Sequence, residues 1–175
     1  MLPYQKPMPP IWIGANGEKT VRGAGRAGAD AWIAPPNVKI NWVKGHLQYY
    51  KEGLEEAGLE TEGREYPIIR ELYIADTDKQ AEDEADEFIK NEYADYSEYG
   101  DEVEYWRTMY HELREKAFIF GSPDTVAAKI ENLAEAGFNH FIWRVCWKGM
   151  PNEMALNTIR RFSEEVMPRF QEVTA

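Results

Sequence analysis

One local pattern occurs twice in this chain and limits the folds that are open to it. The segments RAGADAWIA (26–34) and AEAGFNHFIW (134–143) each read as a helix end, an Ala-Gly pair, two further residues and an apolar run of strand length. Glycine often ends helices because it adopts the left-handed backbone conformation readily. A continuous apolar run is typical of a strand that is buried on both faces of a parallel sheet. The repeated pattern therefore predicts βα units and a parallel α/β fold.

Four such units are predicted along the chain. Strands are expected at 11–15, 31–34, 68–75 and 141–147, and each precedes a helical segment. The stretch 79–117 reads as an inserted helical pair, and residues 1–10, with four prolines, as a linker-like lead-in to a single domain at 1–175. Four units form either a small open sheet or half of an eight-stranded barrel, since a whole barrel needs about 250 residues.

Several residues predict where the helices begin and end. Gly28, Gly58 and Gly137 are expected just past helix ends, and Ser122 is expected to cap the helix that starts at Pro123. Thr77 and the glutamine three residues later match a capping box. Glycines 23 and 25 weaken the helix at 18–27, and we expect them to allow close packing of this helix on the sheet.

Composition and charge exclude several classes of function. The net charge of −11 argues against nucleic acid as a partner, because binding to phosphates requires Lys and Arg. No apolar run approaches the ~20 residues that cross a membrane, and the first residues lack the apolar core of a signal peptide, so a cytoplasmic location is expected. The single Cys146 excludes an internal disulfide, and the three histidines show no metal-binding spacing, so no metal is expected.

Candidate functional residues are expected at the carboxyl ends of the strands, where sites of parallel sheets gather. Arg144 is the sharpest candidate, because a guanidinium in an apolar strand needs a partner. It can bind an anionic ligand or a flavin carbonyl, or it can form a structural ion pair, for example with Glu71. Strand alternation places Arg144 and Cys146 on one face and Trp147 on the other, with Cys146 expected to be buried and unreactive. Trp147 can line a ligand or pack in the core.

The order and spacing of three segments resemble the carboxyl-terminal half of the bacterial-luciferase-like monooxygenases. They are PPIWIGANGEKTVRGAGRAGADAWI (9–33), IIRELYIADTDKQAEDEA (68–85) and the stretch from FIFGSPDTV to EEVMPRF (118–170). The resemblance implies a TIM barrel, of which this chain holds a parallel (βα)4 half with an inserted helical pair. It also implies flavin mononucleotide (FMN) as the cofactor, with the deazaflavin F420 as the alternative, and oxidation of a small organic substrate.

The same resemblance assigns roles to individual residues. Gly14, Ala15 and Asn16 match the rim beside the flavin, together with Arg144, and Trp147 and Met150 lie in the loop that borders the substrate. The matching amino-terminal half is not in this chain, so we expect a homo-oligomer or a separate amino-terminal half as the partner. The alternative is a non-catalytic half-barrel that acts in assembly or binding. A third possibility is a small open α/β domain that binds another anion.

Overall fold

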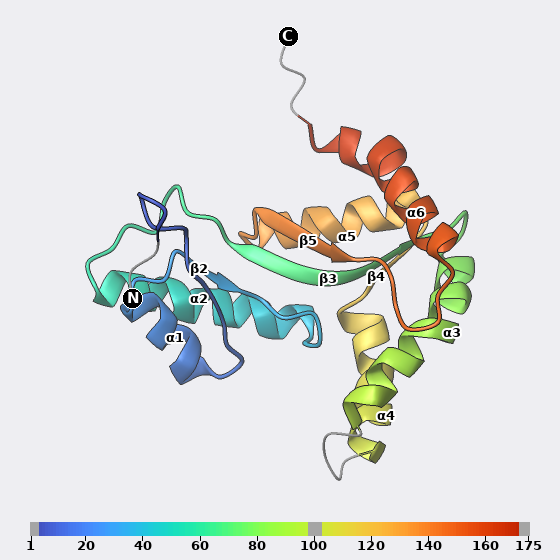
Figure 1. The fold of residues 1–175 in the computed structure, drawn as a ribbon, viewed down its shortest axis with the longest axis horizontal. Coiled ribbons are helices and arrows are strands. Elements are labelled where there is room, and N and C mark those ends of the chain that lie inside the picture. Colours follow the sequence, from blue (N-terminus) through green and yellow to red (C-terminus); the bar gives the residue numbers. More distant parts are fainter. Residues whose placement is uncertain (1–3, 98–102, 172–175) are drawn as a thin grey trace. The chain divides into compact units, whose positions relative to one another are not determined.

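The computed structural model describes residues 4–97 and 103–171, in which five strands alternate with six helices (Figure 1). The elements are β1 (Trp12–Gly14), α1 (Glu18–Arg26), β2 (Ala31–Ile33), α2 (Ile40–Glu56), β3 (Pro67–Ile74), α3 (Asp78–Ser97), α4 (Val103–Lys116), β4 (Ile119–Gly121), α5 (Pro123–Glu135), β5 (His140–Arg144) and α6 (Asn152–Arg161). A π-helical turn (Phe162–Val166) and a 3-10 turn (Met167–Arg169) follow α6. Residues 4–10 of the expected lead-in form neither helix nor strand.

The strands form two sheets. β1 and β2 pair in parallel, with Ile13 opposite Trp32, and a single parallel bridge joins Ala34 to Ile68 at the start of β3. The second sheet has the order β4-β3-β5, and β3 and β4 are parallel, with Tyr73 opposite Phe120. The predicted parallel α/β fold with a helical pair between two strands is therefore confirmed. The strand β4 was not predicted, because three residues directly after a helix are too few for a strand pattern to show.

The chain divides into two compact units. Unit 1 runs to Ile69 and includes the returning segment Ala136–Ile142, whereas unit 2 comprises Arg70–Glu135 and the chain from Trp143 onward. The boundary falls inside β3 and inside β5, so these two strands contribute residues to both units.

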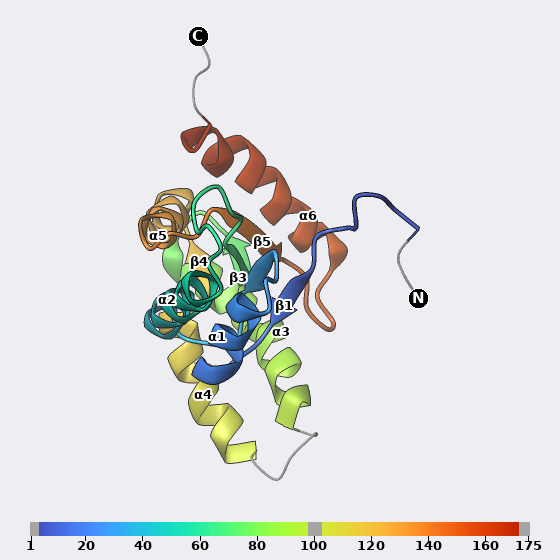
Figure 2. The ribbon, with the colours of Figure 1, turned by 90° about the vertical axis from the view of Figure 1, so that its left-hand side faces the viewer.

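Unit 1 is organised by the close approach of α1 and α2, which lie side by side in Figures 1 and 2. A Cβ atom at Gly53 would lie 2.1 Å from the carbonyl oxygen of Arg22, and one at Gly25 would lie 2.3 Å from that of Tyr50. Only glycine fits there. The expectation that Gly23 and Gly25 bring α1 close to the sheet is wrong, because Gly25 contacts α2 and a Cβ at Gly23 would meet no atom within 4 Å.

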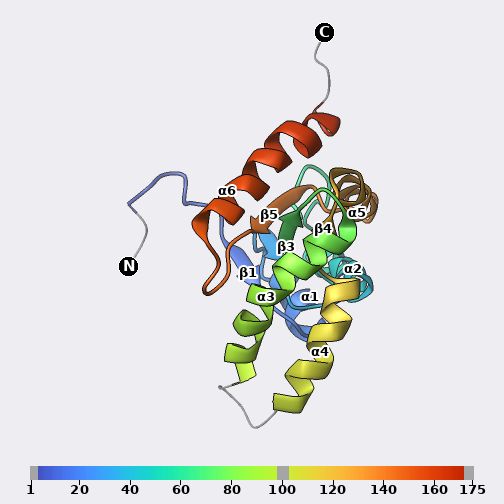
Figure 3. The same cartoon turned by 90° about the vertical axis from the view of Figure 1, so that its right-hand side faces the viewer.

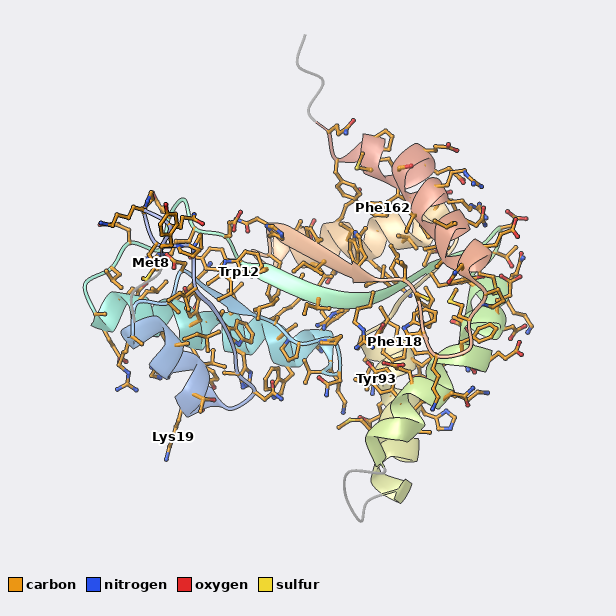
Figure 4. The ribbon with its side chains drawn as sticks, viewed as in Figure 1. Met8, Trp12, Lys19, Tyr93, Phe118 and Phe162 are labelled. Atoms are coloured by element: carbon orange, nitrogen blue, oxygen red, sulfur yellow. The ribbon has the colours of Figure 1, made fainter. Side chains whose placement is uncertain are left out.

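Unit 2 is organised by aromatic side chains. The helices α3 and α4 form a hairpin (Figure 3), and Figure 4 shows Tyr93 of α3 directed towards Phe118, with ring centroids 5.3 Å apart. Arg114 of α4 joins the two helices through Glu82, at 2.9 Å, and Asp86, at 3.3 Å. The core cluster contains Tyr73, Ala75, Ala81, Ala85, Ile89, Tyr93, Tyr110, Leu113, Ala117, Phe118, Phe120, Trp147 and Met150.

The long buried strand is β3 rather than the strand near residue 141. All residues of β3 from Arg70 to Ile74 are buried, whereas every residue of β5 is only partly buried. The prediction of a buried strand at 141–147 is therefore wrong in its burial and its length. β3 lies between β4 and β5 in the sheet order, whereas β5 lies at an edge. Edge position alone does not expose a strand, because β4 lies at the other edge and all three of its residues are buried, with α3 and α5 packed against it. An apolar sequence cannot report which strand is central.

The predicted helix ends are confirmed. Gly28, Gly58 and Gly137 have positive φ angles of 71°, 69° and 101°, which explains why glycine stands at each. The hydroxyl of Thr77 accepts a hydrogen bond from the Gln80 backbone N–H at 3.2 Å, as expected of an N-cap. The hydroxyl of Ser122 accepts one from the Thr125 N–H at 3.4 Å.

Candidate functional site

The first candidate group follows β1 and belongs to unit 1. Gly14 and Asn16 are exposed and Ala15 is partly buried, so this turn is accessible to a ligand. Two contacts hold its backbone: the carbonyl of Ala15 accepts a hydrogen bond from the Trp32 indole at 2.9 Å, and the hydroxyl of Thr20 donates to the carbonyl of Gly17 at 2.8 Å. The turn is therefore ordered by its neighbours and leaves the Asn16 side chain at the surface.

A hollow of about 630 Å³ adjoins this turn. Its lining is made of Ile13, Gly14, Ala15, Asn16, Thr20, Gly23, Ala24 and Ala27. Three of these residues lie on α1 and Ala27 is its C-cap, all at helical spacing, so the hollow extends along the side of α1 and β1. The lining side chains are small, and the volume falls in the range of sites that bind small molecules. In a βα sheet, this is also the position in which a neighbouring strand and helix pack.

The second candidate group surrounds Arg144 in unit 2. Its Nη1 lies 3.2 Å from Oε1 of Glu71, and its Nη2 lies 2.9 Å from Oε1 of Glu92 on α3. Glu71, in the middle of β3, is fully buried and also accepts hydrogen bonds from the Trp147 indole at 2.7 Å and the Tyr93 hydroxyl at 3.0 Å. The Glu71 carboxylate is thus the centre of a cluster of three donors.

Opposing effects determine the ionisation of this cluster. Burial raises the pKa of the Glu71 carboxyl, and the charge of Arg144 together with the hydrogen bonds from Trp147 and Tyr93 lowers it. The neighbouring Arg70 is also buried, and burial lowers the pKa of its guanidinium to about 10. The three donors compensate in part for the removal of the Glu71 charge from water.

Three of the predicted residues lie close together: Arg144, Trp147 and Met150. Their arrangement differs from the one expected. Arg144 and Trp147 both bond to Glu71, so the expectation that they lie on opposite faces is wrong. Strand alternation fails there because β5 ends at Arg144. Trp147 and Met150 are buried in the core cluster. Cys146 is exposed, so the expectation of a buried thiol is also wrong.

Sequence reasoning identified part of this cluster. Glu71 was the acid named as a possible partner of Arg144, and the ion pair between them is present. The sequence signal for this pairing was Glu71 itself, an acidic residue inside the largely apolar strand β3. Glu92 and Tyr93 were missed as partners, because they lie on a helix more than 50 residues before Arg144 in the chain and no local pattern links them. The residues after β1 and the Arg144 cluster belong to different compact units.

Two other kinds of site are absent from the described ranges. Residues 4–97 and 103–171 contain no group of three or more His, Cys, Asp or Glu side chains that could hold a metal ion. In the same ranges, none of the helices has the length and apolar character that a membrane span requires.

The family is defined by a sequence match. The family model described as luciferase-like monooxygenase matches residues 1–140, which is most of the chain. The chain belongs to the luciferase-like monooxygenase family. No curated protein matches the chain.

Solved structures agree with this family in their fold. The chain is similar to the monooxygenase RslO1 from Streptomyces bottropensis, with 21% identity and a TM-score of 0.74 over 96% of this chain and 50% of that one. It is similar to the oxygenating constituent of 3,6-diketocamphane monooxygenase from Pseudomonas putida, which is in complex with FMN, with 22% identity and a TM-score of 0.69 over 93% of this chain and 49% of that one.

A third similar structure uses the deazaflavin. It is the coenzyme F420 dependent tetrahydromethanopterin reductase from Methanopyrus kandleri, with 20% identity and a TM-score of 0.64 over 93% of this chain and 51% of that one. The chain therefore has the fold of half a luciferase-like TIM barrel, and it spans about half the length of these solved chains.

Proposed function

We propose that this chain is the carboxyl-terminal half of a flavin-dependent monooxygenase or related oxidoreductase that acts on a small organic substrate. The observation that carries the proposal is the match of the luciferase-like monooxygenase model to residues 1–140. FMN is the proposed cofactor, because a similar structure is in complex with FMN, and F420 is the alternative, because another similar enzyme depends on it. The proposal includes the cytoplasmic location expected from the sequence.

The turn after β1 fits part of a flavin. Gly14 and Ala15 present little side chain, so a flat ring can approach the backbone, and the exposed Asn16 offers an amide donor and an acceptor to a polar ring edge. Bound flavin would supply the redox chemistry, and the chain would orient it. Arg144 is the proposed electrostatic contact, with Trp147 and Met150 as supports of the substrate side. Because both are buried in the core cluster, they would act by shaping the surface around Arg144.

The proposal requires a second half. In the described residues, β1 pairs with β2 alone, so its other edge can accept a strand, and the hollow along α1 can accept the helix of a neighbouring βα unit. The occupant is either a second copy of this chain or a separate amino-terminal half. Either would cover the small side chains that line the hollow.

A flavin titration tests this function. The purified chain, alone and mixed with an amino-terminal half of a luciferase-like protein, is titrated with FMN and in parallel with F420 while the visible absorbance and flavin fluorescence are followed. We expect a spectral shift and a Kd in the micromolar range or below for one of the two cofactors. The absence of a shift with both cofactors in both preparations would exclude the proposed function.

A specific observation favours a second function. Arg144 already forms ion pairs with Glu71 and Glu92, and Trp147 is bonded to Glu71, so these side chains have structural roles within the chain. A half-barrel that serves in assembly or binding, without catalysis, accounts for this arrangement. It predicts a stable oligomer by size measurement in solution and no flavin binding.

A further inference from the structure

We propose that Arg144 is a binding site for an oxyanion and that Glu92 occupies this site in the absence of the ligand. In this arrangement, a phosphate-type or carboxylate group of a ligand displaces the Glu92 side chain, whereas Glu71 stays in place and orients the guanidinium. The inference deepens the proposed function, in which Arg144 contacts the cofactor, and it assigns a regulatory role to α3.

The two carboxylates that flank Arg144 differ in how firmly they are held. The Glu71 side chain is 0% exposed and accepts hydrogen bonds from Trp147 and Tyr93 besides its contact with Arg144. The Glu92 side chain is 28% exposed, and its Oε1 lies 2.9 Å from Nη2 of Arg144. Glu71 is therefore a fixed anchor, and Glu92 is the partner that can leave.

Displacement of Glu92 requires only a side-chain rotation. The helix α3 is fixed by residues on either side of Glu92, since Ile89 and Tyr93 are both buried in the core cluster. Partly exposed ion pairs contribute little net stability, because water solvates the separated charges well. The negative charge of Glu92 also acts unfavourably on Glu71, which is one of the factors that raise the Glu71 pKa. An incoming anion therefore replaces a weak contact.

The guanidinium is suited to such an exchange. Arginine carries five N–H donors in a fixed plane, and it binds planar carboxylates and phosphates better than lysine does. Glu71 engages Nη1, and Nη2 is directed towards Glu92. The Arg144 side chain is 27% exposed, so a ligand oxygen can reach the position that the Glu92 oxygen now takes.

The experiment uses a charge-matched pair of variants of the full chain. Glu92→Gln removes the competing charge, and Glu87→Gln removes an exposed charge from the same helix. Binding of inorganic phosphate, and of acetate in a second series, is measured by calorimetric titration. We expect Glu92→Gln to bind phosphate about tenfold more tightly than the parent chain, and Glu87→Gln to bind within about twofold of it. Acetate in place of phosphate would identify a carboxylate as the preferred group.

Two results would overturn the inference. One is an equal affinity of Glu92→Gln and Glu87→Gln for both anions. The other is a gain that persists when Arg144→Lys is added to Glu92→Gln, because the anion would then bind elsewhere; circular dichroism verifies that the double variant is folded. The flavin titration is separate. A gain in anion affinity without flavin binding supports this inference and excludes the proposed cofactor. Flavin binding without a gain in anion affinity supports the proposed cofactor and overturns this inference.

Discussion

The two compact units build βα structure by different kinds of contact. In unit 1, the helices α1 and α2 touch backbone to backbone at Gly25 and Gly53, so shape alone decides their distance. In unit 2, large aromatic side chains and the buried Glu71 fill the space between elements. The two groups of candidate residues differ in the same way. Gly14 and Asn16 in the turn after β1 are exposed, whereas the Arg144 side chain is held by an ion pair with Glu71. Closely packed glycines tolerate no added atom, whereas a polar cluster can lose one partner and keep others.

The largest effect is expected at the glycine contact of unit 1. In Gly53→Ala, the new methyl group would meet the Arg22 carbonyl at 2.1 Å, so α1 and α2 must separate. We expect the free energy of unfolding to fall by about 3 kcal/mol, as for overpacked cores. Urea unfolding followed by circular dichroism measures the change.

The matched control is Gly23→Ala in α1. A Cβ there meets no atom within 4 Å, and alanine favours helix, so the free energy of unfolding should stay the same or rise by up to about 1 kcal/mol. Equal losses in both variants would show that the two helices are not held by close backbone contact.

A smaller effect is expected at the polar cluster of unit 2. Glu71→Ala leaves the Trp147 indole and the Tyr93 hydroxyl without their acceptor and removes one ion pair of Arg144. We expect a loss of about 2 kcal/mol in the free energy of unfolding, less than for a fully buried pair, because Arg144 keeps Glu92 and is partly exposed. Urea unfolding followed by tryptophan fluorescence reports it.

Glu92→Gln serves as the comparison for this variant. It removes the other carboxylate from the same arginine, and it should cost less than about 1 kcal/mol, because the pair is partly exposed. If the two substitutions cost the same, the distinction between an anchoring and a displaceable carboxylate is wrong.

A further effect, smaller than that of Glu71→Ala, depends on pH and concerns Asp78. Its carboxylate accepts hydrogen bonds from the Ser122 backbone N–H at 2.7 Å and the Thr125 hydroxyl at 2.9 Å, and these bonds to the ionised form lower its pKa. The stabilisation is therefore present above the unfolded pKa of about 3.9 and disappears as the pH falls through the lower folded pKa. Asp78→Asn should cost about 1 kcal/mol at pH 7 and progressively less below pH 3.9.

Urea unfolding at pH 7 and at pH 3 tests this dependence. Asp83→Asn is the control, because the Asp83 side chain is 59% exposed and pairs with Lys79 on the same helix. A cost of Asp78→Asn that is the same at both pH values would contradict the role of the ionised carboxylate.

The comparison of the units also shows which features a sequence can predict. Gly28, Gly58 and Gly137 were predicted correctly as helix ends, because the backbone conformation that they require is a local property. The βα order was accessible for the same reason, since periodicity is read along the chain. The family was indicated by the resemblance of three segments, and the family match agrees with it. The pairing of Arg144 with Glu71 was among the alternatives because a charge in an apolar strand needs a partner.

The tertiary structure decided the properties that depend on residues far apart in the chain. Gly25 faces α2 rather than the sheet, β3 rather than β5 is the central strand, and Trp147 meets Arg144 at one carboxylate. Glu92 became a partner of Arg144 because folding brings α3 to the end of β5 across 52 residues. The amino-acid sequence alone thus determined the resemblance to the family and the elements other than β4. Which strands are buried, which elements are neighbours and which carboxylates pair with Arg144 were decided by packing. Each of these properties depends on side chains that are far apart in the chain and that together exclude water from one place.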